Sequence, residues 1–211
     1  MKILNLYAGI GGNRKLWEDV EVTAVEFNPE IAAIYQEYFP DDTVIVADAH
    51  EYLLAHYKEF DFIWSSPPCQ THSRARFWGS KGGTCEVKYP DAKLWQEIIF
   101  LKNFATCPYV VENVIPYYPV FIAPVIELER HLFWSNWQIK PIPLNNVFRD
   151  HQRITGKTIL YDFNISNTVL PNKTQILRNL VSPEIGLAIL DQVRGIKRKS
   201  KLKQISLLED L

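Results

Sequence analysis

The stretch KILNLYAGIGG, residues 2–12, runs from a short apolar segment into a turn that contains three glycines. The apolar segment is too short for a helix and is typical of a buried strand. Four more segments of this kind follow, at residues 22–26, 44–47, 62–65 and 109–111. Amphipathic segments typical of helices lie between them, at residues 14–19, 29–38, 51–58 and 91–104. Strand and helix therefore alternate, which predicts an α/β fold with a doubly wound, mostly parallel sheet.

The pattern changes after residue 130. The segment HLFWSNW, residues 131–137, predicts another strand, and the residues up to 170 are irregular. Two short helices are predicted near the end, at residues 173–180 and 183–193. The chain contains no internal repeat and no low-complexity linker, and its 211 residues suit one globular domain.

Composition indicates a globular protein. Hydrophobic residues make up 47% of the chain and charged residues 22%, which does not fit a disordered protein. No apolar run approaches the roughly 20 residues of a membrane-spanning helix, and the first residues lack the pattern of a signal peptide. We therefore expect a cytoplasmic protein with no membrane association.

Basic residues gather near the end of the chain. The formal net charge is −1, yet RGIKRKSKLK at residues 194–203 holds six basic residues and no acidic one, which leaves 17 basic and 24 acidic residues elsewhere. Such a run is either a solvated end or an arm that binds phosphate groups. Arg194, Lys197 and Arg198 are therefore candidate contacts to nucleic acid.

The three cysteines, Cys69, Cys85 and Cys107, form no CxxC pair. Neither a disulfide framework nor a four-ligand zinc site is expected from them. Cys69, His72 and Cys85 are a conceivable set of three metal ligands, but we favour a protein without a metal. Thiol chemistry remains open.

Polar residues follow the predicted strands where ligands bind in such sheets, at the carboxyl ends of the strands. The first strand ends in the GxGG turn, and this spacing differs from the GxGxxG that binds a pyrophosphate. Glu26 ends the second strand, where a carboxylate can accept hydrogen bonds from a ribose diol, and Asp48 follows the third, where an acid can meet an adenine amine. A nucleoside without a pyrophosphate fits all three. We expect S-adenosylmethionine, with a nicotinamide cofactor as the alternative.

The fourth strand leads into the segment SSPPCQTHSRARFW, residues 65–78. Pro67 and Pro68 remove two amide donors and fix the backbone, so the turn that presents Cys69 is rigid. A thiol becomes a good nucleophile when cations stabilise its anion, and Arg74 and Arg76 are close in sequence. Cys69 is therefore a candidate nucleophile, although a buried structural cysteine is the alternative.

A fifth strand delivers Glu112 and Asn113 to the same edge of the sheet. A carboxyl group beside a thiol can hydrogen-bond the ring nitrogen of a heterocycle and exchange a proton with it, which makes the ring a better electrophile. Glu112 is therefore a candidate acid or base.

These residues occur in a recognisable order. GIGG, Glu26, PPCQ at residues 67–70 and ENV at residues 112–114 closely resemble the C5-cytosine DNA methyltransferase family. The resemblance covers residues 3–137 and resumes at RNLVSPEIGLAI, residues 178–189, which is similar to the closing segment of the family.

The resemblance implies a fold and a mechanism. It implies a Rossmann-like sheet of the S-adenosylmethionine-dependent methyltransferase type and a target cytosine that is flipped out of the DNA duplex. Cys69 would add to C6 of the base, Glu112 would engage N3, and C5 would then take the methyl group. By analogy, Arg130 would bind the carbonyl oxygen of cytosine, whereas the first arginine of that segment of the family is replaced here by Leu128.

Site residues follow from these arguments. The catalytic residues expected are Cys69, Glu112 and Arg130. The residues expected to bind the cofactor are Tyr7, Gly9, Gly11, Gly12, Glu26, Phe27, Asp48, Ala49, Pro67, Asn179 and Val181. The residues expected to contact nucleic acid are Gln70, Ser73, Arg74, Arg76, Lys81, Asn113, Arg194, Lys197 and Arg198. Residues 70–90, which include GSKGG, resemble the mobile catalytic loop of the family, with Trp78 available to fill the space left by a flipped base.

The chain is short for the family. We assign residues 1–193 to the catalytic domain, with 137–173 as a reduced target-recognition region and 174–193 as a closing helical segment, and residues 194–211 to a basic tail. Fewer than forty residues are marginal for an independent core. We favour a minimal DNA methyltransferase with a short or degenerate target site, because PNK at residues 171–173, Arg149, Arg153 and the basic tail can supply phosphate contacts.

Other functions remain open. The alternatives are a cytosine methyltransferase that acts on RNA or free nucleotides, one recruited by a partner, and an inactive relic that binds cofactor or DNA. The sequence does not identify the target site or a companion restriction endonuclease. We expect a monomer in the cytoplasm of a bacterial or phage-infected cell.

The segment QISLL, from Gln204 to Leu208, resembles the peptide by which bacterial replication proteins bind the sliding clamp. The alternative is a terminal turn that packs on its own domain. The sliding clamp is thus a second expected partner beside DNA.

Overall fold

Seven strands form one sheet in the computed structural model of the chain, which describes residues 1–142, 159–168, 170 and 172–197. Their order across the sheet is β3-β2-β1-β4-β5-β7-β6. The strands are β1 (Lys2–Leu6), β2 (Glu21–Glu26), β3 (Thr43–Val46), β4 (Phe62–Ser65), β5 (Tyr109–Val114), β6 (Ile126–Leu128) and β7 (His131–Ser135). The five from β3 to β5 are parallel, and β7 runs antiparallel to both β5 and β6. The predicted mostly parallel sheet is confirmed.

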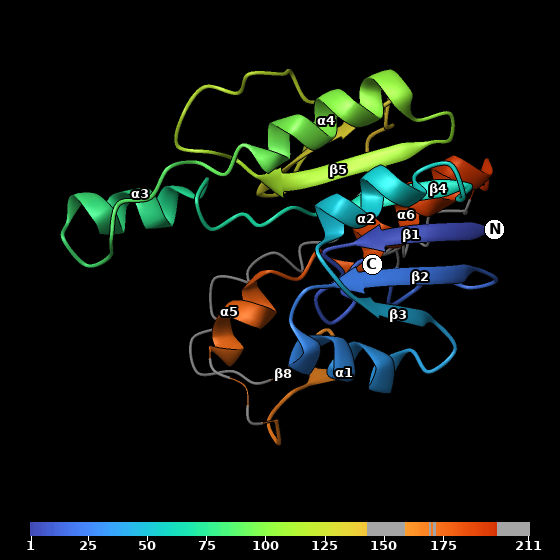
Figure 1. Cartoon of the computed structure of the whole chain (residues 1–211), viewed down its shortest axis with the longest axis horizontal. Helices are drawn as coiled ribbons and strands as arrows, with labels where there is room; N and C mark the ends of the chain where they lie inside the picture. Colours follow the sequence, from blue (N-terminus) through green and yellow to red (C-terminus); the bar gives the residue numbers. More distant parts are fainter. Residues whose placement is uncertain (143–158, 169, 171, 198–211) are drawn as a thin grey trace, which may run out of the picture.

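Helices cover both faces of this sheet (Figure 1). They are α1 (Pro29–Tyr38), α2 (Ala49–His56), α3 (Arg74–Lys81), α4 (Lys93–Phe104), α5 (Lys173–Arg178) and α6 (Pro183–Arg194). Packing places α2 and α4 on one face and α1 and α6 on the other, so the predicted doubly wound arrangement is confirmed. None of the helices in the described part of the chain has the length and apolarity needed to cross a bilayer.

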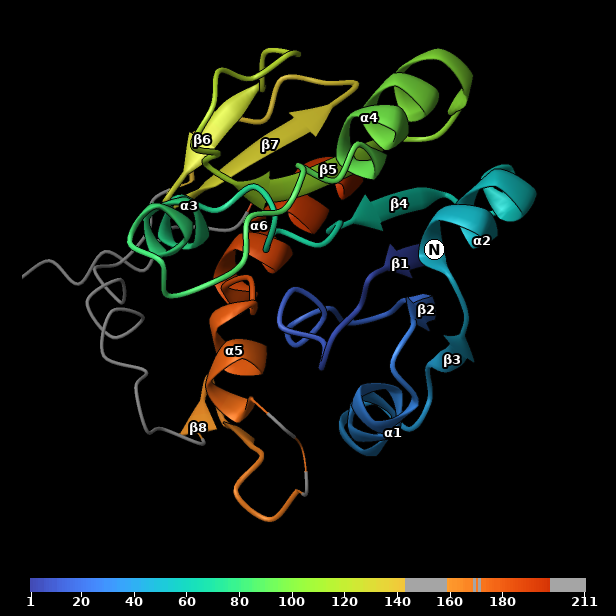
Figure 2. The same ribbon diagram turned by 60° about the vertical axis from the view of Figure 1, so that its left-hand side comes forward.

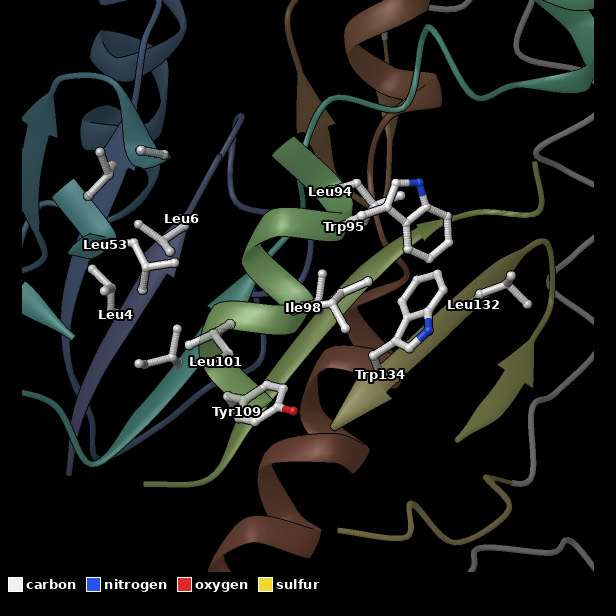
Figure 3. Packing of buried hydrophobic residues seen from close by; sticks show 14 residues of the cluster. Leu4, Leu6, Leu53, Leu94, Trp95, Ile98, Leu101, Tyr109, Leu132 and Trp134 are labelled. Atoms are coloured by element: carbon white, nitrogen blue, oxygen red, sulfur yellow. The ribbon is translucent and has the colours of Figure 1, made fainter. Parts of the chain in front are cut away.

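Two hydrophobic cores hold these layers together. On one face, Leu94, Ile98 and Leu101 of α4 pack against strands β4, β5 and β7, and Trp95 meets Trp134 edge to face with ring centroids 5.7 Å apart (Figure 3). On the other face, Ile185 and Ile189 of α6 pack with aromatic side chains of β4 and β7. Because each strand alternates its side chains between these cores, its register is fixed by burial on both faces.

The helices start where local chemistry requires it. Asn28 accepts hydrogen bonds from the amides of Glu30 and Ile31, at 2.8 and 3.1 Å, and Pro29 occupies the first turn of α1. Asp48 accepts from the amide of His50 at 2.8 Å at the start of α2. Both caps sit directly after a strand, so the carboxyl edge of the sheet is lined by helix N-termini.

The helix predicted at residues 14–19 is wrong. This connection between β1 and β2 is a series of turns with i to i−3 hydrogen bonds, such as that from the amide of Trp17 to the carbonyl of Arg14. Asp19 has a positive φ of 54°, which no α-helix contains. Helix α6 occupies the space beside this segment, since Gly186 lies against the backbone of Asn13. Tertiary packing therefore overrides the helical pattern.

Residues 70–90, predicted as a loop, contain helix α3. Ser73 caps it by accepting from the amide of Arg76 at 3.2 Å, and Gly82 ends it. No residue of α3 is buried, and Figure 1 shows it standing away from the sheet. The segment thus has local helical order but few contacts with the body of the protein.

The described part of residues 137–173 packs on the main fold. Strands β8 (Ile159–Leu160) and β9 (Phe163–Asn164) form a small hairpin, which lies beside α5 in Figure 2. Phe163 is fully buried against the rings of Tyr38 and Phe39, and the Tyr38 hydroxyl donates to the carbonyl of Asn164 at 3.1 Å. These residues therefore extend the core of α1.

Gly186 offers a direct test of this packing. A Cβ at this position would lie 2.1 Å from the carbonyl oxygen of Asn13, so Gly186→Ala forces α6 away from the first turn. We expect the free energy of unfolding, measured by urea denaturation, to fall by about 2 kcal/mol. Gly82→Ala is the matched control, because its nearest new contact is an ordinary 3.4 Å. Equal stability of the two variants would contradict the packing described here.

Candidate active site

A cavity of about 720 Å³ opens at the carboxyl ends of β1, β2, β4 and β5. Sequence-predicted site residues of all three kinds line it. They are Tyr7, Gly9, Glu26, Phe27, Asp48, Ala49, Pro67, Cys69, Gln70, Ser73, Arg76, Glu112, Arg130 and Asn179. The structure therefore brings the predicted cofactor residues and the predicted catalytic residues to one space.

The glycine turn forms one end of this cavity. Gly9 has a positive φ of 55°, and nothing lies within 4 Å of where its Cβ would be. The amide of Gly9 donates to Glu26 Oε2 at 3.0 Å, and the amide of Asn28 donates to Glu26 Oε1 at 2.9 Å. Glu26 is thus held in place by backbone amides at the rim of open space. Phe27 beside it is 74% exposed.

The other two glycines of the turn serve packing. A Cβ at Gly11 would lie 2.2 Å from the ring of Phe39, and one at Gly12 would lie 2.7 Å from the carbonyl oxygen of Val181. Val181 itself is buried in a hydrophobic core. Gly11, Gly12 and Val181 do not line the cavity. Gly11 therefore packs on Phe39 and Gly12 on the closing segment, and the cofactor contacts predicted for these residues stay predictions.

The carboxylate of Asp48 accepts hydrogen bonds from two different helices. Besides capping α2, its Oδ2 accepts from Lys93 Nζ at 2.8 Å. The hydrogen bond from Lys93 lowers the pKa of Asp48 below its ordinary value. Asp48 therefore stays ionised at the cavity wall.

Sequence reasoning missed Glu97. This carboxylate of α4 is fully buried and accepts from Ser65 Oγ at 2.6 Å and from the Tyr7 hydroxyl, and it contacts His50 Nδ1 at 3.0 Å. Burial raises its pKa. It ties α4 to Tyr7 in the cavity wall. The sequence feature that could have identified Glu97 is its position within the apolar face of an amphipathic helix, between Leu94 and Leu101.

The thiol turn is anchored to β5. Asn113 is 1% exposed, and its Nδ2 donates to the carbonyl of Pro67 at 2.8 Å. The amides of His72 and Ser73 donate to the carbonyl of Cys69 at 3.0 and 3.1 Å. Asn113 therefore positions the turn, and its burial leaves no surface for the predicted contact with nucleic acid.

Glu112 and Cys69 both have raised pKa values, and Glu112 contributes to the shift of Cys69. Burial raises the pKa of Glu112 to about 7, although a hydrogen bond from Ser66 and the charge of Arg130 act in the opposite direction. Burial and the charge of Glu112 raise the pKa of Cys69 to about 11, and Arg130 opposes this. The cation near the thiol is thus Arg130, whereas Arg74 and Arg76, predicted for this role, donate to the carbonyls of Pro116 and Glu86.

Arg130 and Asn179 close the other side of the cavity. The Arg130 guanidinium donates to the carbonyl of Arg178, and Cys69 Sγ lies 3.9 Å from Asn179 Oδ1. Arg178, which stands where the family has glycine, thus supplies a backbone acceptor. The closing segment therefore contacts two of the three predicted catalytic side chains, Arg130 and Cys69.

The remaining predicted nucleic-acid contacts are spread out. Arg74 and Lys81 lie on α3, outside the cavity lining, and Lys81 Nζ sits 5.0 Å from the ring centre of Phe77. Arg194 donates to the carbonyls of Glu18 and Asp19 just before β2, at the opposite edge of the sheet. Lys197 is exposed. Arg198 and the segment at residues 204–208 lie outside the described residues.

Metal binding has no support in the geometry. Among the residues that the structure describes, no group of three or more His, Cys, Asp or Glu side chains is placed to hold an ion. His72 is fully buried and its Nδ1 contacts the Tyr118 hydroxyl at 2.5 Å.

A solved structure shares this fold, and another is similar to part of the chain. The methyltransferase EhMeth of Entamoeba histolytica superposes with a TM-score of 0.51 over 92% of this chain and 98% of that chain, at 12% identity. A mutant of Spodoptera frugiperda DNMT2 matches 54% of this chain at 26% identity, with a TM-score of 0.38. The chain spans only 35% of the length of that insect protein. A search of curated proteins finds no match.

One family accounts for the sequence motifs of the cavity. The model of the C-5 cytosine-specific DNA methylase family matches residues 1–114, which include the glycine turn, Glu26, Cys69 and Glu112. The match extends over more than half of the 211 residues. The chain therefore belongs to the C-5 cytosine-specific DNA methylase family.

Proposed function

We propose that the protein methylates C5 of cytosine in DNA, with Cys69 as the nucleophile that adds to C6. One observation supports this most directly: Cys69, Glu112 and Arg130 line the same cavity as Gly9 and Glu26. A cofactor at the glycine end and a base at the thiol end would therefore share one space of about 720 Å³. That volume is within the range of pockets that enclose ligands of this size.

The cofactor of this family is S-adenosylmethionine, which supplies an electrophilic methyl group. The residues present fit it. Gly9 leaves open space where any other residue would place a Cβ, and Glu26 is fixed at the end of β2 where a ribose diol can donate to it. The exposed ring of Phe27 offers a face for an adenine.

The proton of the thiol has a nearby acceptor in this arrangement. In the free protein the thiol is protonated at neutral pH, since its pKa is about 11. Glu112, with a pKa of about 7, is partly ionised there. We infer that Glu112 takes the proton from Cys69 Sγ and gives it to N3 of cytosine, because a neutral Glu112 no longer opposes the thiolate.

Arg130 has two effects in this scheme. Its positive charge lowers the pKa of both Cys69 and Glu112, so it stabilises the thiolate as the sulfur approaches C6. Its guanidinium also lies at the cavity wall, where it can donate to the carbonyl oxygen of the base. Both contributions support the orientation of cytosine with C6 toward Cys69.

Helix α3 suits a role in holding DNA. It carries Arg74, Arg76 and Lys81 in eight residues, and Trp78 is 65% exposed. Cationic side chains contact phosphates, and an exposed aromatic ring can stack on bases that a flipped nucleotide leaves behind. These features support DNA as the substrate. The short or degenerate target site stays a proposal from the sequence: fewer than forty residues, 137–173, are available for target recognition.

The covalent step can be tested with duplex DNA that contains 5-fluorocytosine. With S-adenosylmethionine present, the wild-type protein is expected to form an adduct that survives denaturing electrophoresis, because after methyl transfer the C5 fluorine cannot leave as a proton does. Cys69→Ala is expected to abolish the adduct, and Cys85→Ala, the matched control in the same cavity wall, is expected to retain it.

The same assay separates the alternatives. Adducts on RNA and not on DNA would replace the substrate in this proposal, and adducts that persist in Cys69→Ala would remove the proposed nucleophile. Absence of any adduct on duplex DNA, single-stranded DNA and RNA would indicate a protein that only binds.

The pH dependence of methyl transfer should follow the ionisation of Glu112. Below its pKa of about 7 the carboxyl is protonated and cannot accept the thiol proton, so kcat/KM should fall about tenfold per pH unit on the acid side. Transfer of a radiolabelled methyl group between about pH 5 and 9 measures this. In Glu112→Gln, the fall of kcat/KM at low pH should disappear, and the rate should be lower by a factor of about 10²–10⁴. Glu127→Gln, at an exposed position, should change neither.

A variant of Phe27 tests the proposed position of the cofactor in the cavity. Phe27→Ala should raise the Kd for S-adenosylmethionine about tenfold, because stacking on a base contributes about 1–3 kcal/mol. Isothermal titration calorimetry gives the Kd. Phe121→Ala is the matched control, since Phe121 is equally exposed at 74% but lies outside the cavity lining. Equal affinity in the two variants would contradict the assigned cofactor position.

A further inference from the structure

A second titratable residue meets Glu112 inside the cavity wall. His131 of β7 places Nε2 3.6 Å from Glu112 Oε1, and the two side chains are 5% and 8% exposed. Both residues line the cavity. Neither the family motifs nor the sequence analysis assigns a role to His131.

The sheet register fixes this contact. Glu112 pairs directly with Phe133 across β5 and β7, and Val114 pairs with His131. Side chains of directly paired residues point to the same face, and so do those two positions apart along a strand. Glu112 and His131 are therefore diagonal neighbours on one face, held by backbone hydrogen bonds on both strands.

Charged and hydrogen-bonding groups around Glu112 and His131 affect the protonation of Glu112. Arg130, from the turn between β6 and β7, lowers the pKa of Glu112 by its charge, and Ser66, from the turn after β4, donates a hydrogen bond to it. The charge of Glu112 in turn raises the pKa of Cys69. Glu129 interacts with Arg130 from the same turn. Cationic and hydrogen-bonding neighbours thus oppose the burial that favours a protonated Glu112.

We propose that His131 is a positioning residue that holds Glu112 ionised and oriented in the free enzyme, ready to receive the proton of Cys69. This inference rests on the proposed function. A hydrogen on Nε2 faces the carboxylate in the Nε2–H tautomer and in the charged imidazolium alike, so both forms favour an ionised Glu112. The 3.6 Å separation suits a contact that shortens when a base fills the cavity.

The proton and electron movements balance without another reactant. The S–H bond of Cys69 breaks, and its proton moves to Glu112. The sulfur electron pair forms the bond to C6 of cytosine, and the electrons of the C5–C6 double bond shift into the ring as Glu112 gives the proton to N3. Glu112 ends as a carboxylate beside His131, in the state from which it started.

Variants of His131 separate this role from packing. His131→Met removes the donor but fills the space with an adaptable apolar chain, whereas His131→Gln keeps an N–H near the position of Nε2. Leu132→Ala is the control, because it removes buried packing of β7 on the opposite face of the sheet.

The first readout is the rate of adduct formation on 5-fluorocytosine DNA as a function of pH. In His131→Met, the pH range in which the rate falls on acidification should move up by about one pH unit. At a pH below this range the rate should be about tenfold lower than in the wild type, and at higher pH it should be unchanged. His131→Gln should restore most of the wild-type profile. Leu132→Ala should lower the melting temperature and leave this pH range in place. An unmoved pH range in His131→Met would overturn the inference.

The second readout needs neither substrate nor a variant of His131. The NMR titration of His131 in the wild type and in Glu112→Gln measures the coupling directly, and the pKa of His131 should be lower by about one unit when the carboxylate is removed. Equal values would overturn the inference even if His131→Met fails to fold. If the wild type forms no adduct on any nucleic acid, the proposed function fails, and this titration still decides whether His131 and Glu112 act as a pair.

Discussion

The buried hydrogen bond from Asn113 Nδ2 to the carbonyl of Pro67, 2.8 Å long, joins the two segments on which the chemistry depends. Pro67 and Pro68 have no amide hydrogens, so neither residue can donate a backbone hydrogen bond to β5. Asn113 supplies the donor from the neighbouring strand, and Glu112 precedes it in the chain. The separation of thiol and carboxyl is therefore set by one rigid turn, one strand and one side-chain contact. An asparagine is well suited here because its Oδ1 also accepts from the amide of Val114 at 3.0 Å.

Burial is the largest cause of the pKa shifts of Glu112 and Cys69 in the cavity. It raises the pKa of Glu112 into the neutral range and that of Cys69 above its ordinary value, so both groups hold protons more tightly than they would in water. Arg130 limits both shifts, and its own position depends on the backbone of the closing segment at Arg178. The result is a thiol that stays protonated at neutral pH beside a carboxyl group that titrates there. Such a pair suits an enzyme that forms a thiolate only when a base is present.

The sequence predicted the sheet and most helices well, because β-strand length, apolar periodicity and Asn28–Pro29 are local signals. It failed at residues 14–19, where the contact of Gly186 with Asn13 decides the conformation, and such a contact between distant parts of the chain leaves no local pattern. At the site, the motifs located Cys69, Glu112 and Glu26, but they could not separate Gly9, which faces the cavity, from Gly11 and Gly12, which pack on other residues. Nor could they show that Asn113 turns inward while Glu112 faces the cavity. Glu97 and His131 were missed because each owes its importance to partners on other elements.

The packing of Gly12 on Val181 and of Gly186 on Asn13 has a consequence for synthesis of the protein. Residues 1–12 are translated before α6, yet Val181, just before α6, and Gly186 of α6 supply the surfaces against which Gly12 and Asn13 pack. Until then, Trp17 and the face of the sheet beneath α6 have no cover and are open to chaperones or to self-association. The seven strands are thus translated before this cover, and the packing around the glycine turn is complete only after α6 has been translated.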